Sequence, residues 1–250
     1  MSTVNQNNFS KQAEFYSRYR PVYPPLMYEF LFRHLERKQY AWDCGTGSGQ
    51  VAGYLADHFE LVYANDISAE QLDQAVKKDN IQYVNKPAEN TGFPSGLFDM
   101  VTVAQAIHWF DFDRFYEEVR RTTRQNGLLA VIGYGKVQIN REIDPAINDL
   151  YERAFSTYFW QNREYLNQEY RTIPFPFDEI AAPRFSIKCH WTLNDLEGYF
   201  NSWSPVQKFK SEKGYNPADE TMEIITGKLS PGKPFEVRFP VFMRLGRVSK

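Results

Sequence analysis

A glycine-rich loop between a short apolar strand and a helical pattern constrains this chain most. The segment reads Ala41-Trp42-Asp43-Cys44-Gly45-Thr46-Gly47-Ser48-Gly49-Gln50. Glycine lets the backbone turn tightly and lets a ligand approach it without meeting a Cβ atom. Asp66 ends the next predicted strand, about 20 residues further on, where an acid can accept hydrogen bonds from both ribose hydroxyls of a nucleoside. The segment therefore predicts a nucleoside-binding loop.

Strands and helices alternate through the first half of the chain. Apolar runs predict strands at 40–44, 61–65, 81–84, 99–106 and 128–134. Apolar residues at helical spacing predict helices at 25–35, 51–59, 68–76 and 112–119. Pro24-Pro25 is typical of a helix start, and Ser68 with Gln71 three residues later is typical of an N-cap. This alternation predicts a parallel sheet with helices on both faces.

The pattern changes after the fifth strand. We interpret residues 136–184 as an insertion or lid that contains a helix from Ala146 to Trp160. Alternation predicts a sixth strand at 185–191 and a last strand at 235–239, with a helix at 196–203 between them. Residues 211–234 are rich in turn formers, although 222–225 could be helical.

Composition excludes several classes of protein. The 29 basic and 31 acidic residues give a net charge of −2, which argues against binding to nucleic acid. No apolar run approaches the roughly 18 residues of a membrane span, and the start MSTVNQNNFS does not look like a signal peptide. With two cysteines, neither a disulfide framework nor a zinc site of several cysteines is expected. We expect a cytoplasmic protein with no metal, membrane or obligate protein partner.

The glycine spacing discriminates between nucleoside ligands. A dinucleotide fingerprint requires a third glycine at position 50, where this chain has Gln50, and no Lys-Ser/Thr follows as in a phosphate-binding Walker loop. An NAD-type oxidoreductase is therefore disfavoured but stays open as an alternative. A non-catalytic nucleoside-binding or scaffold protein is a third possibility.

The spacing D-x-G-x-G-x-G resembles the first motif of class I S-adenosylmethionine (SAM) methyltransferases. Further matches follow in order: Pro87-Ala88-Glu89, Phe98-Asp99, 104–110, Asn126-Gly127-Leu128-Leu129 and 238–247. An N-terminal Tyr16, Tyr19, Arg20, Pro21 and Tyr23 together with Gln105-Ala106-Ile107-His108-Trp109 looks most like the small-molecule branch that includes trans-aconitate methyltransferases. The resemblance implies a single Rossmann-like α/β domain over 1–250, with an arm at 1–23, a helical lid at 136–184 and an antiparallel last strand.

The resemblance also implies SAM as the cofactor and a set of residues around it. Gly45, Thr46, Gly47 and Gly49 would pass beneath the methionine and ribose, and Asp66 would bind the ribose. The remaining expected contacts come from Tyr19, Arg20, Asp43, Ile67, Ala88, Glu89 and Gln105. Among these, Ile67 would flank the adenine, Arg20 would hold the methionine carboxylate, and Asp43 would order the loop through backbone N–H groups.

His108 is the candidate catalytic residue, because it follows the carboxyl end of a strand, where open α/β sheets bind their ligands. It could act as a base, donate a hydrogen bond to a carboxylate, or only support the helix that starts at Asp111. Aromatic residues could line an acceptor pocket or belong to the core: Trp109, Tyr134, Phe159, Trp160 and Trp203. The expected function is methyl transfer to a small organic acceptor, for which the resemblance favours a carboxylate.

Overall fold

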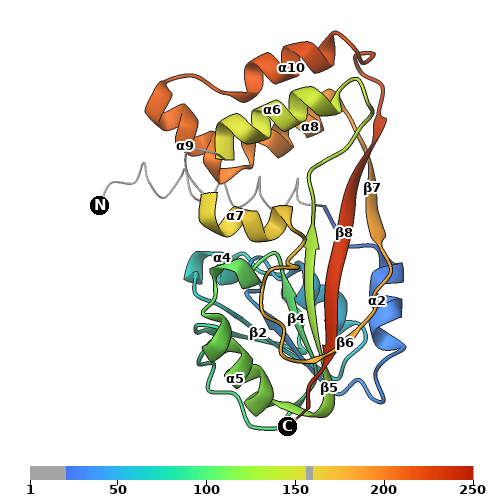
Figure 1. The fold of residues 1–250 in the computed structure, drawn as a ribbon, viewed down its shortest axis with the longest axis vertical. Helices are drawn as coiled ribbons and strands as arrows, with labels where there is room; N and C mark the ends of the chain where they lie inside the picture. The colour runs from blue at the N-terminus through green and yellow to red at the C-terminus, as the bar shows by residue number, and fades with distance from the viewer. Residues whose placement is uncertain (1–20, 156–159, 250) are drawn as a thin grey trace. The chain divides into compact units, whose positions relative to one another are not determined.

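The computed structural model describes residues 21–155 and 160–249, and the side chains of 160–163 lie outside it (Figure 1). The chain divides into two compact units. The sheet unit contains residues 23–135, 165–185 and 241–250, and the helical unit contains 136–164 and 186–240. The expectation of a single domain with a lid at 136–184 stays a prediction.

The sheet unit contains the five predicted strands of the first half of the chain, part of the predicted last strand, and one strand, β6, that was not predicted. They are β1 (Tyr40–Cys44), β2 (Leu61–Asp66), β3 (Ile81–Asn85), β4 (Phe98–Ala104), β5 (Thr123–Tyr134), β6 (Asp178–Ile180) and the end of β8 (Phe235–Arg247). Their spatial order is β3-β2-β1-β4-β5-β8-β6. The strands from β3 to β5 are parallel, and β8 runs antiparallel to both β5 and β6. The predicted Rossmann-like sheet with an antiparallel last strand is confirmed.

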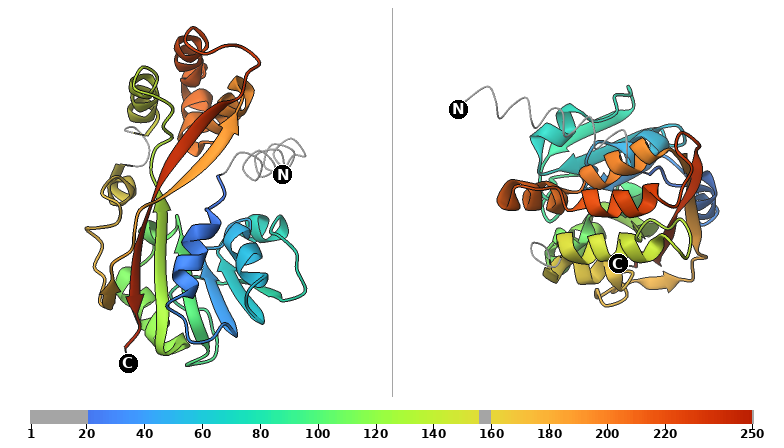
Figure 2. Two further views of the ribbon diagram at one scale, coloured as in Figure 1. Left: turned by 90° about the vertical axis from the view of Figure 1, so that its right-hand side faces the viewer. Right: turned by 90° about the horizontal axis from the view of Figure 1, so that it is seen from above.

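Helices cover both faces of this sheet. They are α2 (Pro25–Phe32), α3 (Gln50–Ala56), α4 (Ala69–Asp73) and α5 (Phe112–Thr122), with a short 3₁₀ turn η1 (Ile107–Trp109) after β4. Figures 1 and 2 show α2 and α5 on opposite sides of the sheet. The predicted caps are present, because α2 begins at Pro25 and the Ser68 hydroxyl accepts a hydrogen bond from the Gln71 N–H.

Alternation along the strands sends side chains to two different cores. Trp42 on β1 packs with Phe115 of α5, whereas the neighbouring Asp43 points to the other face and accepts a hydrogen bond from the N–H of Ala52 on α3. Val101 and Leu129 on the adjacent strands belong to the α5 side. The sheet therefore buries an aromatic core on one face and brings a single carboxylate under α3 on the other.

The helical unit contains α6 (Asp144–Phe155), α8 (Leu193–Asn201), α9 (Ser204–Lys213) and α10 (Ala218–Thr226), with β7 (Phe185–Trp191) pairing the first part of β8. The helix α7 (Trp160–Asn167) spans the boundary between the two units. The described part of α6 agrees with the predicted helix up to Phe155, and residues 156–159 of that prediction lie outside the described residues. One expectation is corrected: the stretch 211–234 is largely helical up to Thr226.

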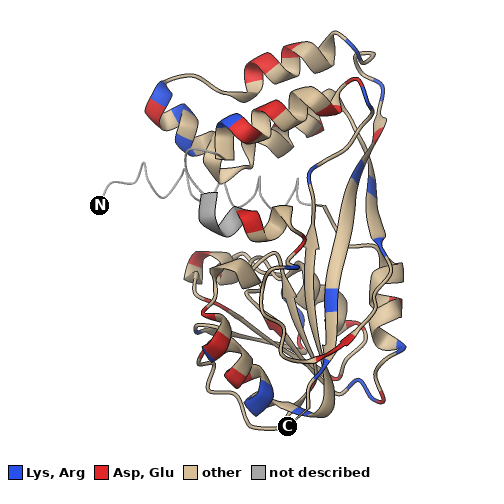
Figure 3. Ribbon diagram, in the orientation of Figure 1, with Lys and Arg blue, Asp and Glu red and all other residues tan. Residues whose placement is uncertain are grey.

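Charged residues of both signs are spread over the helices (Figure 3). In α5, Asp113 lies in the first turn and Arg120 and Arg121 lie in the last. The charges of these side chains interact favourably with the helix dipole and stabilise the helix. No helix in the described part of the chain is long and apolar enough to cross a membrane.

Candidate cofactor and acceptor site

The three glycines of the loop after β1 all adopt the left-handed backbone conformation, with φ of +64° at Gly45, +56° at Gly47 and +75° at Gly49. A Cβ atom added at Gly45 would lie 2.6 Å from Cβ of Ala106, and one added at Gly49 would lie 2.4 Å from the Tyr83 hydroxyl. Side chains are therefore excluded at both positions by backbone conformation and by packing.

Gly47 differs from Gly45 and Gly49, because a Cβ atom added there meets no close neighbour among the described residues. The nearest of their atoms is Oε1 of Gln71, at 3.8 Å. The Gly47 N–H donates to Oδ2 of Asp66 at 2.9 Å, and the Ser68 N–H donates to Oδ1 of the same carboxylate at 2.9 Å. Asp66 thus ties the glycine loop to the start of α4. Ile67, beside it, is 77% exposed.

Asp43 lies beneath the loop and is fully buried. Its carboxylate accepts hydrogen bonds from the Thr46 hydroxyl at 2.5 Å, the Thr102 hydroxyl at 2.8 Å and the Ala52 N–H at 3.1 Å. Burial raises its pKa to about 6, against the opposing effect of these hydrogen bonds, and the nearby charge of Asp66 raises it further. One donor, the Thr46 hydroxyl, belongs to the loop, and the backbone donor belongs to α3, so the ordering of the loop by Asp43 stays a prediction.

The segment after β3 carries Ala88 and Glu89 and is fixed at both ends. At its start, the buried Asn65 accepts a hydrogen bond from Nε1 of Trp42 and donates to the Lys86 carbonyl. Ala88 is buried, and Oε1 of Glu89 accepts a hydrogen bond from the Asp111 N–H at the start of α5. Glu89 therefore links this segment to the helix that follows His108.

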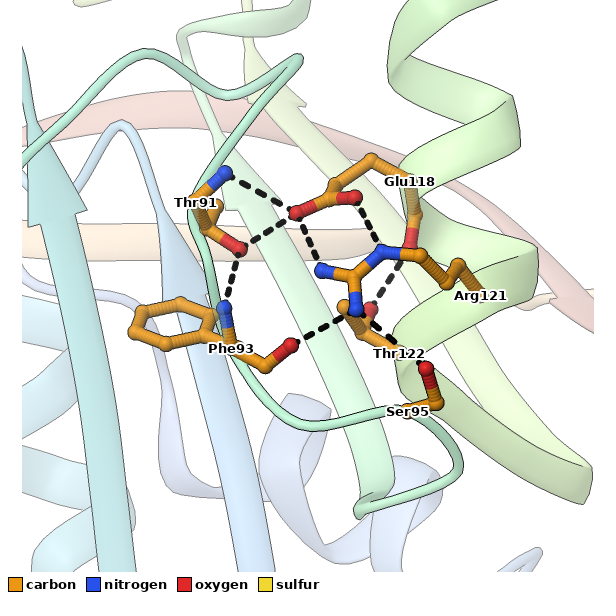
Figure 4. Close-up of polar contacts among 6 residues, drawn as sticks. All are labelled: Thr91, Phe93, Ser95, Glu118, Arg121 and Thr122. Carbon is orange, nitrogen blue, oxygen red and sulfur yellow. Dashed lines mark hydrogen bonds and ion pairs between the residues drawn. The ribbon is translucent and has the colours of Figure 1, made fainter.

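A second carboxylate fixes the end of the segment (Figure 4). The Thr91 N–H and hydroxyl both donate to Glu118 on α5, and Arg121 donates to both oxygens of the same carboxylate. Burial alone would raise the pKa of Glu118, but these hydrogen bonds outweigh it and lower the pKa below its ordinary value. Arg121 also donates to the Phe93 carbonyl. We call these residues (Thr91, Phe93, Glu118, Arg121) the loop clamp.

Gln105 directly follows β4 and has a strained backbone conformation, with φ of +56°. Its side-chain amide donates to the Tyr134 carbonyl at the end of β5, and its backbone N–H donates to the carbonyl of Ile132. Tyr134 in turn packs against Tyr23, with 6.0 Å between ring centroids. The carboxyl ends of the two central strands are thereby joined through Gln105.

His108 lies in the short 3₁₀ turn η1 after β4, and its side chain is buried. Its Nδ1 lies 3.0 Å from the hydroxyl of Tyr170, and the two rings are stacked. Trp109 is 58% exposed and packs against the His108 ring. Asp111 caps α5 by accepting from the Arg114 N–H. His108 therefore does not cap this helix.

Other predicted site residues lie elsewhere. Tyr19, Arg20 and Phe159 lie outside the described residues, and the Trp160 side chain is also outside them. Trp203 belongs to the helical unit, where its buried ring contacts four aromatic neighbours: Tyr151, Phe155, Tyr199 and Phe200.

Comparison with known proteins identifies the family. A family model described as a methyltransferase domain matches residues 42–131. A candidate methyltransferase from Dictyostelium discoideum is 33% identical over 98% of this chain and 96% of its own length. A candidate SAM-dependent methyltransferase from Saccharomyces cerevisiae is 27% identical over 69% of this chain and 62% of its own length.

A solved structure agrees with these sequences. The candidate type II methyltransferase from Anaeromyxobacter dehalogenans has 35% identity and a TM-score of 0.85, covering 92% of this chain and 98% of that one. The chain therefore belongs to the class I SAM-dependent methyltransferases. It is an enzyme that uses SAM as its methyl donor.

Three residues of the site were not predicted. Thr102 is directly opposite Asp43 in the register between β1 and β4, so strand alternation could have indicated it. The buried Asn65 directly precedes Asp66 on β2. Tyr170 lies 62 residues from its partner His108, in a stretch without a regular pattern, and no sequence signal indicates it.

Proposed function

We propose that this methyltransferase transfers the methyl group of SAM to a carboxylate oxygen of a small organic acid. The observation that supports the proposal most is the contact between the glycine loop and the segment after β4. Gly45 lies so close to Ala106 and Phe110 that no side chain fits between them. His108 lies between those two residues in sequence, so its turn is adjacent to the loop expected to hold the cofactor.

The residues of the loop fit SAM. Gly47 presents an open, approachable backbone, and Ile67 offers an exposed apolar side chain for the adenine. Asp66 would accept hydrogen bonds from the ribose, since a carboxylate has lone pairs beyond the two that Gly47 and Ser68 use. When bound, the cofactor supplies an electrophilic methyl group, and the protein's task is mainly to position the two reactants.

A carboxylate acceptor requires little acid–base chemistry from the protein. Carboxylic acids are ionised near neutral pH, so their oxygen is already nucleophilic. His108 would then orient the acceptor by donating a hydrogen bond, rather than by removing a proton. An alcohol or ammonium acceptor would instead need a base.

The proposal is tested by incubating the protein with labelled SAM and matched acceptors: dicarboxylic and tricarboxylic acids, their amides, and the corresponding alcohols and amines. We expect methyl esters, which are recognised by release of label in base, from the acids alone. Methylation of only the alcohols or amines would contradict the proposal.

The pH dependence of the rate separates the two roles of His108. With a carboxylate acceptor, the rate of His108→Gln is reduced and follows the same pH profile as the wild type between about 5.5 and 8. A wild-type rate that climbs through about pH 6.5, together with a flat profile in the variant, would make His108 a base. His190→Gln, an exposed histidine on β7, is the control.

A further inference from the structure

Tyr170 is a buried residue held in an unfavourable backbone conformation. Its φ is +60°, a region that residues other than glycine rarely adopt, and none of its surface is exposed. Its N–H donates to the Tyr165 carbonyl at 2.7 Å, and its ring packs edge-on against Phe242 with centroids 5.4 Å apart. Strain of this kind persists only where surrounding contacts determine the conformation.

Arg244 supplies the strongest of those contacts. Its guanidinium donates to the carbonyls of Tyr170 and Ile173, and it forms a two-point ion pair with Glu179, with both N–O distances at 2.9 Å. The same group lies over the ring of Phe175. Paired guanidinium–carboxylate geometry is stronger and more directional than a single contact. The backbone of Tyr170 is thereby anchored to β8 and β6.

This anchored backbone directs the phenol toward His108. The hydroxyl lies 3.0 Å from Nδ1, and the ring planes are inclined by 26°. Both side chains are buried, and the hydrogen bond at Nδ1 and the stacking of the rings fix how the imidazole lies against the phenol. In a neutral imidazole one nitrogen donates and the other accepts, and the hydrogen bond at one nitrogen determines which is which.

We infer that Tyr170 is a positioning residue for the acceptor reaction: its hydroxyl donates to Nδ1 and holds His108 with its proton on Nε2. The phenol is the better donor of the two groups, since its O–H is more acidic than a neutral imidazole N–H. In this tautomer Nε2 is a hydrogen-bond donor, which is the form that orients a carboxylate. The inference rests on the proposed function for the identity of the group that Nε2 contacts.

The tautomer can be measured without any acceptor. In protein labelled with ¹⁵N, long-range correlation spectra distinguish a protonated from an unprotonated imidazole nitrogen, and His108→Gln identifies the His108 signals. At pH 7.5 to 8 we expect a protonated Nε2 and an unprotonated Nδ1 in the wild type. In Tyr170→Phe we expect both nitrogens to shift toward the averaged values of a tautomer mixture. A protonated Nδ1 in the wild type, or unchanged shifts in Tyr170→Phe, would overturn the inference.

Tyr165→Phe is the matched control, because it removes a phenol hydroxyl from the same segment without touching His108. Its His108 signals should equal those of the wild type. Calorimetry with S-adenosylhomocysteine (SAH) should give equal affinity for all three proteins, whereas kcat/KM for the acceptor should fall on the order of 10-fold in Tyr170→Phe alone. A fixed tautomer with no methylated acid would refute the proposed function only. Methylated acids together with a mixture of His108 tautomers in the wild type would refute the inference only.

Discussion

At the scale of single residues, two glycines with similar backbone conformations allow an effect on cofactor binding to be distinguished from an effect on stability. Gly47 and Gly232 both have positive φ, +56° and +75°, and among the described residues neither has an atom within 3.5 Å of an added Cβ. An alanine at either position therefore costs a similar amount of backbone strain. Only Gly47 lies in the loop expected to contact the cofactor.

We predict that Gly47→Ala weakens SAH binding by at least 10-fold, while Gly232→Ala leaves it unchanged. The added methyl group occupies the open space over the loop, so about 1.4 kcal/mol or more of binding is lost. Isothermal titration calorimetry measures the affinities, and urea denaturation should show similar stabilities for the two variants. Equal affinities would place the cofactor elsewhere. This pair of variants tests cofactor binding more directly than Asp66→Ala, which also removes two hydrogen bonds from backbone N–H groups within the protein.

Two buried aspartates lie near opposite ends of neighbouring strands and are stabilised differently. Asp99, at the start of β4, accepts hydrogen bonds from the N–H groups of Gln39 and Tyr40 and pairs with Arg37 and Arg124. Among its described contacts, Asp43 has hydroxyl and N–H donors but no cation. Its pKa is therefore raised.

We predict that Asp43 makes the protein less stable as pH rises from about 4 to 6. The folded-state pKa of about 6 exceeds the ordinary value of 3.8, so the folded state holds the proton more tightly, and this contribution is lost as pH rises through 6. Relative to Asp43→Asn, the wild type should lose roughly 2 kcal/mol of unfolding free energy between pH 4 and pH 7. Urea denaturation at the two pH values measures it. A constant difference would contradict the prediction.

At the scale of elements, the loop clamp connects the stability of α5 to the shape of the segment after β3. We predict that Thr91→Val lowers the unfolding free energy by about 1–3 kcal/mol and weakens SAH binding several-fold. The variant keeps the side-chain shape but leaves Glu118 without one hydroxyl donor. Thr122→Val is the control, since its hydroxyl donates to the Glu118 carbonyl within α5. It should lose stability without losing affinity for SAH.

Elements with strong local signals were predicted well. Ser68 and Pro25 begin their helices because capping and proline geometry act within a few residues. The helical unit was predicted less well. Gly214 and Pro217 lie between α9 and α10 and are typical of turns, whereas the two helices are held by packing on α6 and α8. Packing between helices distant in sequence has no local pattern.

The same distinction applies to the site. The glycine loop and Asp43 are recognisable because one short segment must satisfy backbone and ligand together. Tyr170 and the loop clamp act across long sequence separations, where only the folded chain joins the partners. The role of each predicted cofactor contact stays a prediction that the variants above test.

At the scale of the whole molecule, ligand binding should raise thermal stability. At 100 times its dissociation constant, SAH stabilises the folded state by about 2.7 kcal/mol, which for a chain of this size corresponds to roughly 5–10 °C in Tm. NAD⁺ at the same concentration should leave Tm unchanged, because Gln50 replaces the third glycine of a dinucleotide fingerprint. Stabilisation by NAD⁺ but not by SAH would contradict the assignment of the loop.

The separation of roles along β4 has an evolutionary consequence. One end of this strand is held by Asp99 and its two arginines, and the other leads into the turn that carries His108. Mutations beyond the carboxyl end can accumulate while the ionic anchor keeps the sheet folded. A library that varies His108 and Trp109 and retains Arg37, Asp99 and Arg124 should thus yield a high proportion of folded proteins, from which new acceptor preferences can be selected.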